Sequence, residues 1–433
     1  MDIYLLKDIP ILIRTDTMGL FFLILTVFTW VMNLIFSIEY MKKERHRLRY
    51  YIFFTLTMLS MVGICISGNL ITMYVFYEFM SLLSLPLVLH EQTAEAIAAG
   101  KKYIFYSMGG AFMGLVGFFF IYRYGTTLTF TPGGVINPGL IEGHETALYL
   151  VTLFVIIGFG SKAGMFPLHG WLPTAHPVAP SPASAYLSGN ITKMGLFVIV
   201  RYIYYLIGPS YLKGTWVQYA FIGLTLVTIV MGSMMAYKEG LFKKRLAYST
   251  VSQVSYALLG IAFMTKWALV GALLHVVFHS LVKNTLFEVA GAVIHKTGFK
   301  NVKDYKDLAR KMPVTMWCYT LVSLTLVGVP PTSAFLSKWY LAQGALEASI
   351  PVLSWLAPVC LIISALLTAG YLLSITLKAF FPGDEYDYPC LEKKEPDLYM
   401  LIPILIMTVC AVAMGIWAGL ITNIVNGIVN DLL

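Results

Sequence analysis

Four lysines lie within long apolar stretches of this 433-residue chain: Lys162, Lys193, Lys283 and Lys338. A lysine inside a membrane costs roughly 2.5–3.5 kcal/mol on insertion scales, and leucine would pack better at each position. One lysine near a helix end could reach the headgroups with its long side chain, but this explanation fits four such residues poorly. Burial disfavours the ammonium form, so a buried lysine can take up and release protons near neutral pH. We therefore interpret these lysines as proton carriers.

Other titratable side chains share these stretches. Glu78 lies in LITMYVFYEFMSLLSLPLVL and needs a cationic partner in lipid, for which Lys162 is the candidate. His275, His279 and Lys283 are spaced four residues apart and so line one face of a helix. Two histidines at this spacing could ligate a metal, but HVVFH lacks the glutamate of the zinc-protease motif and no third ligand is evident. We expect no metal and favour a proton relay through near-neutral imidazoles.

A second intramembrane carboxyl group, Glu288, follows Lys283 in LVKNTLFEVAGAVIH. On a helix the two side chains point to different sides, so we do not pair them and assign Glu288 no role. Ser249, Ser252 and Gln253 in RLAYSTVSQVSY could help to hold water beside the histidine relay.

Two apolar stretches contain residues that interrupt a helix. The run VIIGFGSKAGMFPLHGWLP contains Pro167, and the run LVGVPPTSAFLSKWYL contains Pro330 and Pro331. Proline removes a backbone donor and blocks the preceding turn, so we expect both helices to break there. Irregular backbone at membrane depth survives only inside the protein or beside a wet cavity. Lys162 and Lys338 lie close to these breaks, where carbonyl groups freed at a half-helix end would stabilise an ammonium group.

The composition indicates a membrane environment for these elements. The chain is 58% hydrophobic and 12% charged, with a mean hydropathy of +0.76, whereas about a quarter of a soluble domain is charged. About twelve stretches reach the roughly 20 residues that a membrane span requires. They lie near residues 17–38, 50–67, 69–89, 103–122, 147–178, 183–206, 215–237, 247–264, 267–294, 313–345, 351–378 and 398–428. We predict an all-α integral membrane protein that forms a single membrane domain over residues 1–433.

The two broken helices are the fifth and tenth of the predicted spans. If spans two to six and seven to eleven form two five-helix repeats, each break takes the fourth place in its repeat. An odd number of spans per repeat makes the repeats inverted, an arrangement associated with transport sites. The predicted divisions are an N-terminal flank with the first helix (1–48), the two repeats (49–206 and 207–381), and a last loop with the C-terminal helix (382–433).

The distribution of basic residues predicts the orientation. The loops that share one side hold 20 lysines and arginines, and the other side holds six. The positive-inside rule places the first group in the cytoplasm and both termini on the outer side of the cell membrane. The net charge of +8 is then a topology signal toward anionic lipid, and we expect no nucleic-acid partner. The N-terminus lacks the form of a cleaved signal peptide, so the first span is expected to direct insertion.

Three further patterns are interpreted as structural. The run from Gly158 to Ala163 matches a dinucleotide-binding form, but it lies within an apolar span and no strand precedes it. Gly110 and Gly114 form a small-residue contact typical of packed membrane helices. The five cysteines show no metal-ligand or redox spacing, and we interpret them as core residues. We expect no cofactor and no catalytic centre within the chain.

The segment KAGMFPLHGWLPTAHPVAPSPASAYLSGNITKMGLFVIVR at 162–201 resembles the signature of the antiporter-like membrane subunits. This family occurs in respiratory complex I, multisubunit cation/proton antiporters and membrane-bound hydrogenases. KRLAYSTVSQVSY at 244–256, HVVFHSLVKNTLF at 275–287 and GVPPTSAFLSKWY at 328–340 resemble further family motifs in the same order. The resemblance covers about residues 12–430. It implies a fourteen-helix fold, of which this chain lacks the first two helices and the long lateral helix of the largest relatives.

The resemblance also implies roles for individual residues. In the family a glutamate and a lysine on neighbouring helices form a coupling pair, which Glu78 and Lys162 match. Lys193 matches a second lysine that carries the proton onward. Lys283 and His279 match a central lysine and histidine, and Lys338 matches the residue that leads to the exit. With the histidines beside Lys283, the predicted proton path is Glu78, Lys162, Lys193, His275, His279, Lys283 and Lys338.

We therefore expect a proton-translocating subunit of a larger membrane complex, with other membrane subunits as partners, including another antiporter-like subunit. The segments PSPAS at 180–184 and GVPPTSAFLSKWYL at 328–341 are most similar to hydrogenase-type or cation/proton-antiporter-type relatives. Two alternatives are sodium/proton exchange by the same subunit and a passive membrane scaffold with inert lysines. Sodium requires several oxygen ligands, and two intramembrane carboxylates are few, so protons are the favoured ion.

Overall fold

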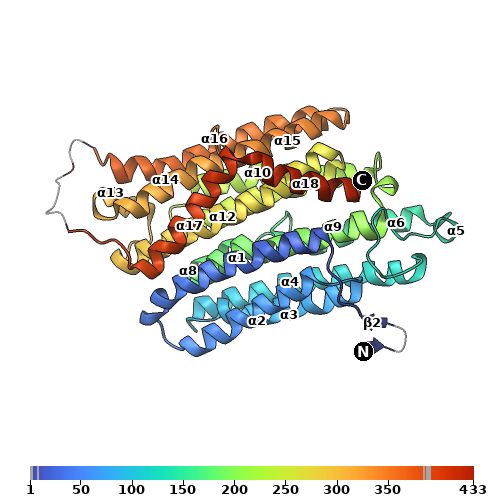
Figure 1. Ribbon diagram of the computed structural model, residues 1–433, viewed down its shortest axis with the longest axis horizontal. Coiled ribbons are helices and arrows are strands. Elements are labelled where there is room, and N and C mark those ends of the chain that lie inside the picture. Colours follow the sequence, from blue (N-terminus) through green and yellow to red (C-terminus); the bar gives the residue numbers. More distant parts are fainter. Residues whose placement is uncertain (1–2, 7–8, 384–385, 387–391) are drawn as a thin grey trace.

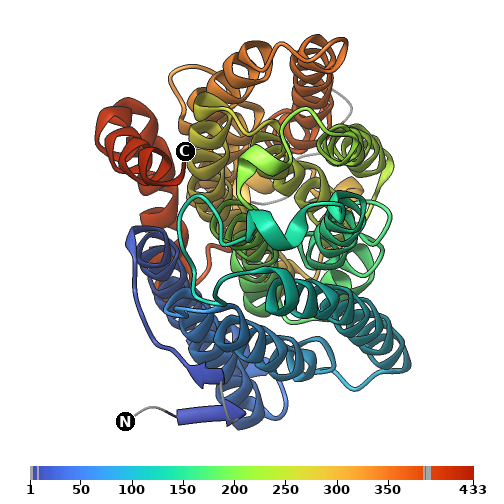
Figure 2. The same ribbon diagram turned by 90° about the vertical axis from the view of Figure 1, so that its right-hand side faces the viewer.

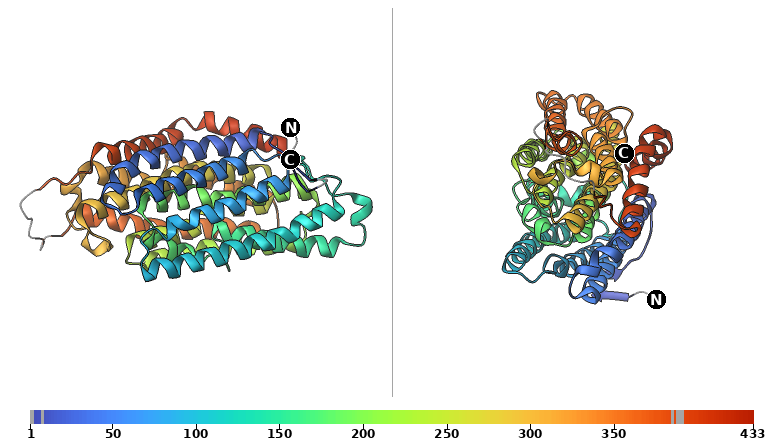
Figure 3. Two further views of the ribbon diagram at one scale, coloured as in Figure 1. Left: turned by 90° about the horizontal axis from the view of Figure 1, so that it is seen from below. Right: turned by 90° about the vertical axis from the view of Figure 1, so that its left-hand side faces the viewer.

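The apolar stretches form long helices that lie side by side along one axis of the molecule (Figure 1). The computed structural model describes residues 3–6, 9–383, 386 and 392–433. Seen end-on, the helices form a bundle with the N-terminal strands at its edge (Figure 2), and the view from below shows the same parallel alignment (Figure 3). Eleven helices among the described residues are long and apolar enough to cross a membrane. The chain is therefore a multi-span integral membrane protein, as predicted.

The first half of the bundle follows a short antiparallel hairpin of β1 (Ile3–Leu6) and β2 (Ile9–Ile11). Its first membrane helices are α1 (Thr17–Tyr40), α2 (Arg47–Cys65), α3 (Leu70–Val88), α4 (Ala94–Tyr124) and α6 (Glu145–Ala163). A composite helix completes this half with α8 (Ser181–Tyr186), the π-helical turn η2 (Leu187–Ile191), α9 (Thr192–Val200) and the π-helical turn η3 (Arg201–Ile207).

The second half contains α10 (Trp216–Lys238), α11 (Phe242–Phe263), α12 (Lys266–Thr297), α14 (Pro313–Val327), α15 (Ser333–Glu347), α16 (Leu353–Phe380), α17 (Leu398–Ile416) and α18 (Ala418–Leu432). Short elements lie in the connections: η1 (Met41–Lys43), α5 (Pro138–Ile141), α7 (Leu172–Val178), η4 (Pro209–Tyr211), η5 (Val302–Asp304) and α13 (Leu308–Lys311).

Both proline-containing stretches are interrupted. α6 ends at Ala163, and the chain turns at Gly164, whose φ is 81°, before α7 begins. α14 ends in the same way at Gly328, whose φ is 88°, before α15 begins. Glycine adopts this left-handed conformation without steric penalty and commonly ends helices. The helices therefore end at glycines that precede the prolines, and Pro167 and Pro330 lie in the connecting segments.

The broken pair α14–α15 adds a twelfth crossing to the eleven span-length helices. Each break takes the fourth place in a run of five crossings, from α2 to η3 and from α10 to α16. Because five is odd, the second run begins on the opposite side from the first, which gives the predicted inverted order. Both termini lie at one end of the bundle and α13 lies at the other (Figure 1).

Three helices form the centre of the bundle. In the most apolar 18-residue stretch of the composite helix from Ser181 to Ile207 and of α12, every residue is buried, and in that of α11 94% of the residues are buried. In the corresponding stretches of the other spans only 33–56% of the residues are buried, because one side of each faces outward. Polar and ionisable groups in a membrane are found mainly where a helix faces the interior of a bundle. Two of these central helices, the composite helix and α12, therefore keep Lys193 and Lys283 from lipid.

Two glycines bring α4 and α6 into close contact. A Cβ atom at Gly110 would lie 2.3 Å from the carbonyl oxygen of Gly158, and one at Gly158 would lie 2.5 Å from the carbonyl oxygen of Gly110. Only glycine permits this approach of the two backbones. The packing role predicted for Gly110 is confirmed, and the glycine run that begins at Gly158 serves the same contact.

The last crossing is bent, whereas the sequence predicted one helix over 398–428. α17 ends at Ile416, the chain changes direction at Trp417, and α18 continues to Leu432. Just before the bend, a Cβ atom at Gly415 would lie 2.5 Å from the carbonyl oxygen of Pro331. The absence of a side chain at Gly415 lets α17 pack directly against the second helix break. The bend comes directly after this contact in the chain.

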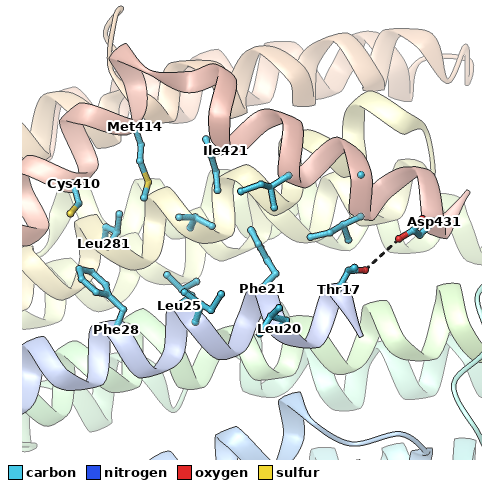
Figure 4. A pocket seen from close by; sticks show the side chains of 15 residues that line it. Thr17, Leu20, Phe21, Leu25, Phe28, Leu281, Cys410, Met414, Ile421 and Asp431 are labelled. Atoms are coloured by element: carbon cyan, nitrogen blue, oxygen red, sulfur yellow. Dashed lines mark hydrogen bonds between the residues drawn. The ribbon is translucent and has the colours of Figure 1, made fainter. Parts of the chain in front are cut away.

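α18 continues toward the end of the bundle where α1 begins. Thr17 Oγ1 donates to Asp431 Oδ2 at 3.4 Å, as Figure 4 shows. An apolar pocket of about 670 Å³ lies between α1, α12 and the two C-terminal helices, with Phe28 and Met414 among its lining residues. None of the buried lysines lines this pocket, so it is separate from the site described below.

A buried ion pair joins the start of α1 to η3. Arg201 is 1% exposed, and its Nη2 donates to Asp16 Oδ1 at 2.6 Å. The rings of Phe197 and Tyr205 lie 4.9 and 4.3 Å from the guanidinium carbon. Partial burial opposes ionisation of Asp16, but the hydrogen bonds and charge of Arg201 outweigh it and hold the pKa of this carboxyl below its ordinary value. Arg201 is one of the six basic residues assigned from the sequence to the outer side, and the structure places it inside the bundle.

We expect the substitution Asp16→Ala to lower the free energy of unfolding by about 3 kcal/mol, because it leaves the guanidinium of Arg201 buried without its partner. The effect lies at the low end of the range for such pairs because Asp16 is 35% exposed. Thermal unfolding in detergent micelles measures it. Asp431→Ala is the control, with an expected change within about 0.5 kcal/mol. Equal stability of Asp16→Ala and the wild type would show that the pair does not anchor α1.

Candidate functional site

Lys162 lies in the last turn of α6 and is 1% exposed. Its Nζ donates to Ser81 Oγ (3.0 Å), Tyr103 OH (2.7 Å) and Ser107 Oγ (3.0 Å), which come from α3 and α4. Three acceptors satisfy the three donors of an ammonium group. Tyr103 OH also lies 2.5 Å from Ser84 Oγ, so the hydroxyl chain continues along α3. This lysine is therefore held by hydroxyl groups and not by carbonyls freed at a helix end.

Glu78 does not form the expected ion pair with Lys162. Its Oε1 accepts from Tyr74 OH at 2.9 Å, and its Oε2 has no hydrogen-bond partner among the described residues. The side chain is half-buried, and Ser81, one turn further along α3, binds the lysine instead. Glu78 and Lys162 are near enough to interact electrostatically, but they are not in contact.

Lys193 lies in α9, just after the π-helical turn η2, and is 2% exposed. Its Nζ donates at 2.5 Å to the carbonyl oxygen of Ser188, which also accepts from Thr192 Oγ1 at 2.8 Å. π-Helical turns are frequent at functional sites. Gly195 brings α9 against α6, because a Cβ atom there would lie 3.0 Å from the Cβ of Lys162. The helices that carry the first two lysines are thus in direct contact at this level.

Lys283 lies in the middle of α12 and is 0% exposed. Its Nζ donates to Ser249 Oγ at 2.7 Å and to the carbonyl oxygen of Leu246 at 3.2 Å. Ser249 Oγ lies 2.7 Å from Tyr371 OH, which donates to Thr368 Oγ1 at 3.2 Å. A chain of hydroxyl groups therefore connects Lys283 on α12 through α11 to α16.

The two histidines of α12 extend from the centre of the bundle toward the second break. The rings of His275 and His279 stack with their centroids 5.8 Å apart and an interplanar angle of 14°. His275 Nδ1 lies 2.9 Å from Ser337 Oγ, next to Lys338 in α15. Neither ring nitrogen of His279 has a hydrogen-bond partner within the described chain. The stripe predicted from the spacing thus runs between Lys283 and the helix of Lys338.

A narrow cavity lies beside this stripe. Lys193, Gln253, His275 and His279 line it, and it is too narrow to hold a water molecule in this arrangement. A hydrated connection between Lys193 and the histidines therefore requires the helices to open slightly. Across residues 3–6, 9–383, 386 and 392–433, no group of three or more histidine, cysteine, aspartate or glutamate side chains could hold a metal ion.

Lys338 lies in α15 beside the second break. Its Nζ donates to the carbonyl oxygens of Leu326 (2.7 Å) and Val327 (2.8 Å), which end α14. These carbonyls carry the negative end of the helix dipole, so they stabilise an ammonium group. The ring centroid of Tyr256 lies 5.3 Å from Nζ. Unlike the other three lysines, Lys338 is partly exposed.

The structure buries further titratable side chains that the predicted path does not include, among them Lys243 and His176. Lys243 was counted as a loop charge, but it lies in the first turn of α11, is 9% exposed and donates to the carbonyl oxygen of Ala179. His176 in α7 is fully buried, and its ring stacks on Phe287 at 4.8 Å. α11 begins five residues before the predicted span, so hydropathy alone left Lys243 outside the membrane helix.

Residues 67–375 match a protein family described as NADH:quinone oxidoreductase/Mrp antiporter, transmembrane. The chain is 32% identical over 423 residues to NADH-quinone oxidoreductase subunit N of Desulforudis audaxviator, covering 93% of this chain and 82% of that protein. It is 29% identical to hydrogenase-4 component B of Escherichia coli, with 94% of this chain and 62% of that protein covered. It is also 29% identical to Na(+)/H(+) antiporter subunit A1 of Staphylococcus aureus, with 94% and 53% covered.

Two solved structures have the same fold. The Mrp complex from Dietzia sp. contains a chain that superposes with a TM-score of 0.82 at 21% identity, covering 98% of this chain and 84% of that chain. A chain of the membrane-bound sulfane sulfur reductase, an archaeal respiratory membrane complex, superposes with a TM-score of 0.85 at 23% identity, with 100% and 86% covered. The relatives and structural neighbours are thus components of multisubunit membrane complexes.

Proposed function

Because this chain belongs to the NADH:quinone oxidoreductase/Mrp antiporter family, we propose that it moves protons across the membrane as one subunit of a multisubunit complex. The observation that carries this proposal is the lysine series, which comprises Lys162, Lys193, Lys283 and Lys338. Each is bonded to hydroxyl or carbonyl groups. Within the described chain none of them has a carboxylate at ion-pair distance. When an amine without a fixed counter-ion loses its proton, no buried carboxylate is left without a partner.

In the proposed path a proton moves from one amine to the next through water and hydroxyl groups. Lys162 receives it at the first break, and Lys193 takes it across the contact between α6 and α9. Lys283 holds it at the centre, where Ser249 accepts from the ammonium form. The histidines then carry it to Lys338, whose carbonyl partners end α14. Each amine returns to its neutral form when it passes the proton on.

Glu78 is the proposed coupling group of this path. It is half-buried on α3 next to the exposed Phe79, where another subunit can bind. A charge brought near Glu78 changes the electric field at Lys162 and hence how strongly Lys162 holds its proton. We propose that other membrane subunits, including another antiporter-like subunit, provide that charge. The two runs of five crossings, residues 49–206 and 207–381, would act as the two units of the path.

We further propose that the chain lies in the cell membrane with both termini on the outer side. The termini lie at one end of the bundle, and the connection that contains α13 lies at the other (Figure 1). If Arg201 and Lys243 are left out because both are buried, the α13 side holds 19 basic residues and the opposite side holds five. The positive-inside rule therefore supports a cytoplasmic location for the α13 side.

Reconstitution of the purified complex into sealed vesicles tests the proposed function. A pH-sensitive dye inside the vesicles reports proton movement while the complex turns over. We expect proton translocation in sodium-free buffer, because the series offers amines and imidazoles and few oxygen ligands for sodium. Translocation that requires sodium would indicate sodium/proton exchange. Turnover without proton movement in tightly sealed vesicles would indicate a passive scaffold.

The variant Glu78→Gln tests the coupling role in the same vesicles. We expect proton translocation to fall roughly tenfold, the effect of about 1.4 kcal/mol of lost electrostatic interaction with Lys162. Glu347→Gln, at an exposed position on α15, is the matched control and should translocate at the wild-type rate. Equal rates for the two variants would remove Glu78 from the path.

A further inference from the structure

Glu288 is a buried carboxyl group that has no role in the path proposed above. It is 0% exposed, and neither carboxyl oxygen has a hydrogen-bond partner among the described residues. A carboxylate kept from water without a partner is much less stable than the neutral acid, so this site favours a bound proton. Ionisable groups inside a membrane protein are more often functional than structural.

Polar groups from neighbouring helices surround this acid. From α2, Tyr50 is close enough to interact electrostatically with Glu288, and its buried phenolic oxygen has no hydrogen-bond partner among the described residues. From α8, Ser181 lies against the next turn of α12, since a Cβ atom at Gly291 would lie 2.5 Å from the Ser181 Cβ. From α7, His176 stacks on the phenylalanine that precedes Glu288. The titratable groups here are a phenol and an imidazole, and no cation pairs with the acid in the described structure.

The same face of α12 leads outward to an open polar pocket. Gly291 and Ile294 follow Glu288 at intervals of three residues, so they lie on one face of the helix. Ile294 lines a pocket of about 700 Å³ at the cytoplasmic end of the proposed orientation. Burial and the charge of Glu91 raise the pKa of Glu44 in this pocket. The titratable residues that line it are Tyr40, Glu44, Glu91, Glu95, Lys243 and Lys300.

In the other direction the face leads to a network of buried amides. Asn284, four residues before Glu288, donates from Nδ2 to Asn190 Oδ1 at 3.2 Å. Its Oδ1 accepts from Asn33 Nδ2 at 2.8 Å. Asn190 belongs to η2, the turn that provides the carbonyl oxygen for Lys193. The amide network therefore ends beside the second lysine of the series.

From this arrangement we infer that Glu288 is a proton-binding site on a lateral branch, which takes protons from the polar pocket and delivers them near Lys193. The carboxylate gains a proton that arrives past Tyr50 and Ser181, so an O–H bond forms at one carboxyl oxygen. That bond breaks when the proton moves on through water held by the amides of Asn284 and Asn190. This inference rests on the proposed function and adds a second inlet to it.

The variant Glu288→Gln, in membrane vesicles that hold the intact complex, tests the branch. Glutamine has the same size but cannot release a proton. We expect the initial rate of proton uptake to fall about tenfold. A change of external pH should produce an infrared difference band of a buried neutral carboxyl group in the wild type, and this band should be absent from the variant. Glu347→Gln is the control, with wild-type uptake and an unchanged band. If Glu288→Gln fails to assemble, Tyr50→Phe replaces it, with slower uptake and a shifted band expected.

If the assembled Glu288→Gln variant, or Tyr50→Phe in its place, takes up protons at the wild-type rate, the branch is overturned. This holds for any result of the infrared measurement. A pH-dependent carboxyl band that persists in Glu288→Gln also overturns it. Lys283→Ala, measured in parallel, separates the two proposals. If Lys283→Ala stops translocation while Glu288→Gln does not slow it, the lysine path stands and the branch alone fails.

Discussion

Proton translocation should fall by about 100-fold or more in the Lys283→Ala variant, the effect of removing a positioned proton-transfer group. Lys283 is fully buried, and its amine is the donor to Ser249 and the Leu246 carbonyl group. Alanine leaves no group at this position that can hold a proton between Lys193 and the histidines. The measurement is dye-monitored acidification of vesicles that contain the purified complex.

A matched lysine separates this effect from a general loss of charge. Lys378 lies exposed on α16, and Lys378→Ala should translocate protons at the wild-type rate. Assembly of Lys283→Ala is checked by co-purification of the other subunits. An assembled Lys283→Ala complex that pumps like Lys378→Ala would show that protons bypass the centre of α12.

The second large effect is expected for Lys162→Ala, with a loss of translocation that also reaches about 100-fold. Three hydroxyl groups from α3 and α4 converge on this amine, so alanine removes the group that connects them. Proton uptake and release are measured separately in the same vesicles. Release should fail even when the complex is given a strong driving reaction.

Tyr103→Phe provides a graded comparison for Lys162→Ala. It removes one of three acceptors, and we expect a fall of about tenfold, since a hydrogen bond to a charged group is worth roughly 1.5–3 kcal/mol. A Tyr103→Phe defect as complete as that of Lys162→Ala would assign the proton transfer to the phenol instead. A Lys162→Ala variant with normal release would remove the first break from the path.

The sequence predicted the helices, the breaks and the buried lysines because each depends on local chemistry or on the cost of polar groups in lipid. Lys338 illustrates this: its position after a helix break predicted carbonyl partners, and it binds the carbonyl oxygens of Leu326 and Val327. The family resemblance predicted the antiporter-like fold. Each of these features can be predicted from the residues of a single segment.

Contacts between helices could not be predicted in this way. Glu78 and Lys162 were expected to pair, but the lysine binds Ser81, one turn further along α3, and Glu78 accepts from Tyr74 instead. The bend at Trp417 depends on how α17 meets the second break. The amide network of Asn284 joins three helices that are far apart in the sequence. Such features require the relative positions of helices.

The measurement that tests the central claim most directly is proton translocation by the Lys283→Arg variant. Arginine keeps the positive charge and can donate to the same oxygens, but it does not release its proton in proteins. If the buried amine must lose and regain a proton in each cycle, the assembled variant will not translocate protons. Translocation at the wild-type rate by Lys283→Arg would show that a fixed charge is sufficient, and it would contradict the account.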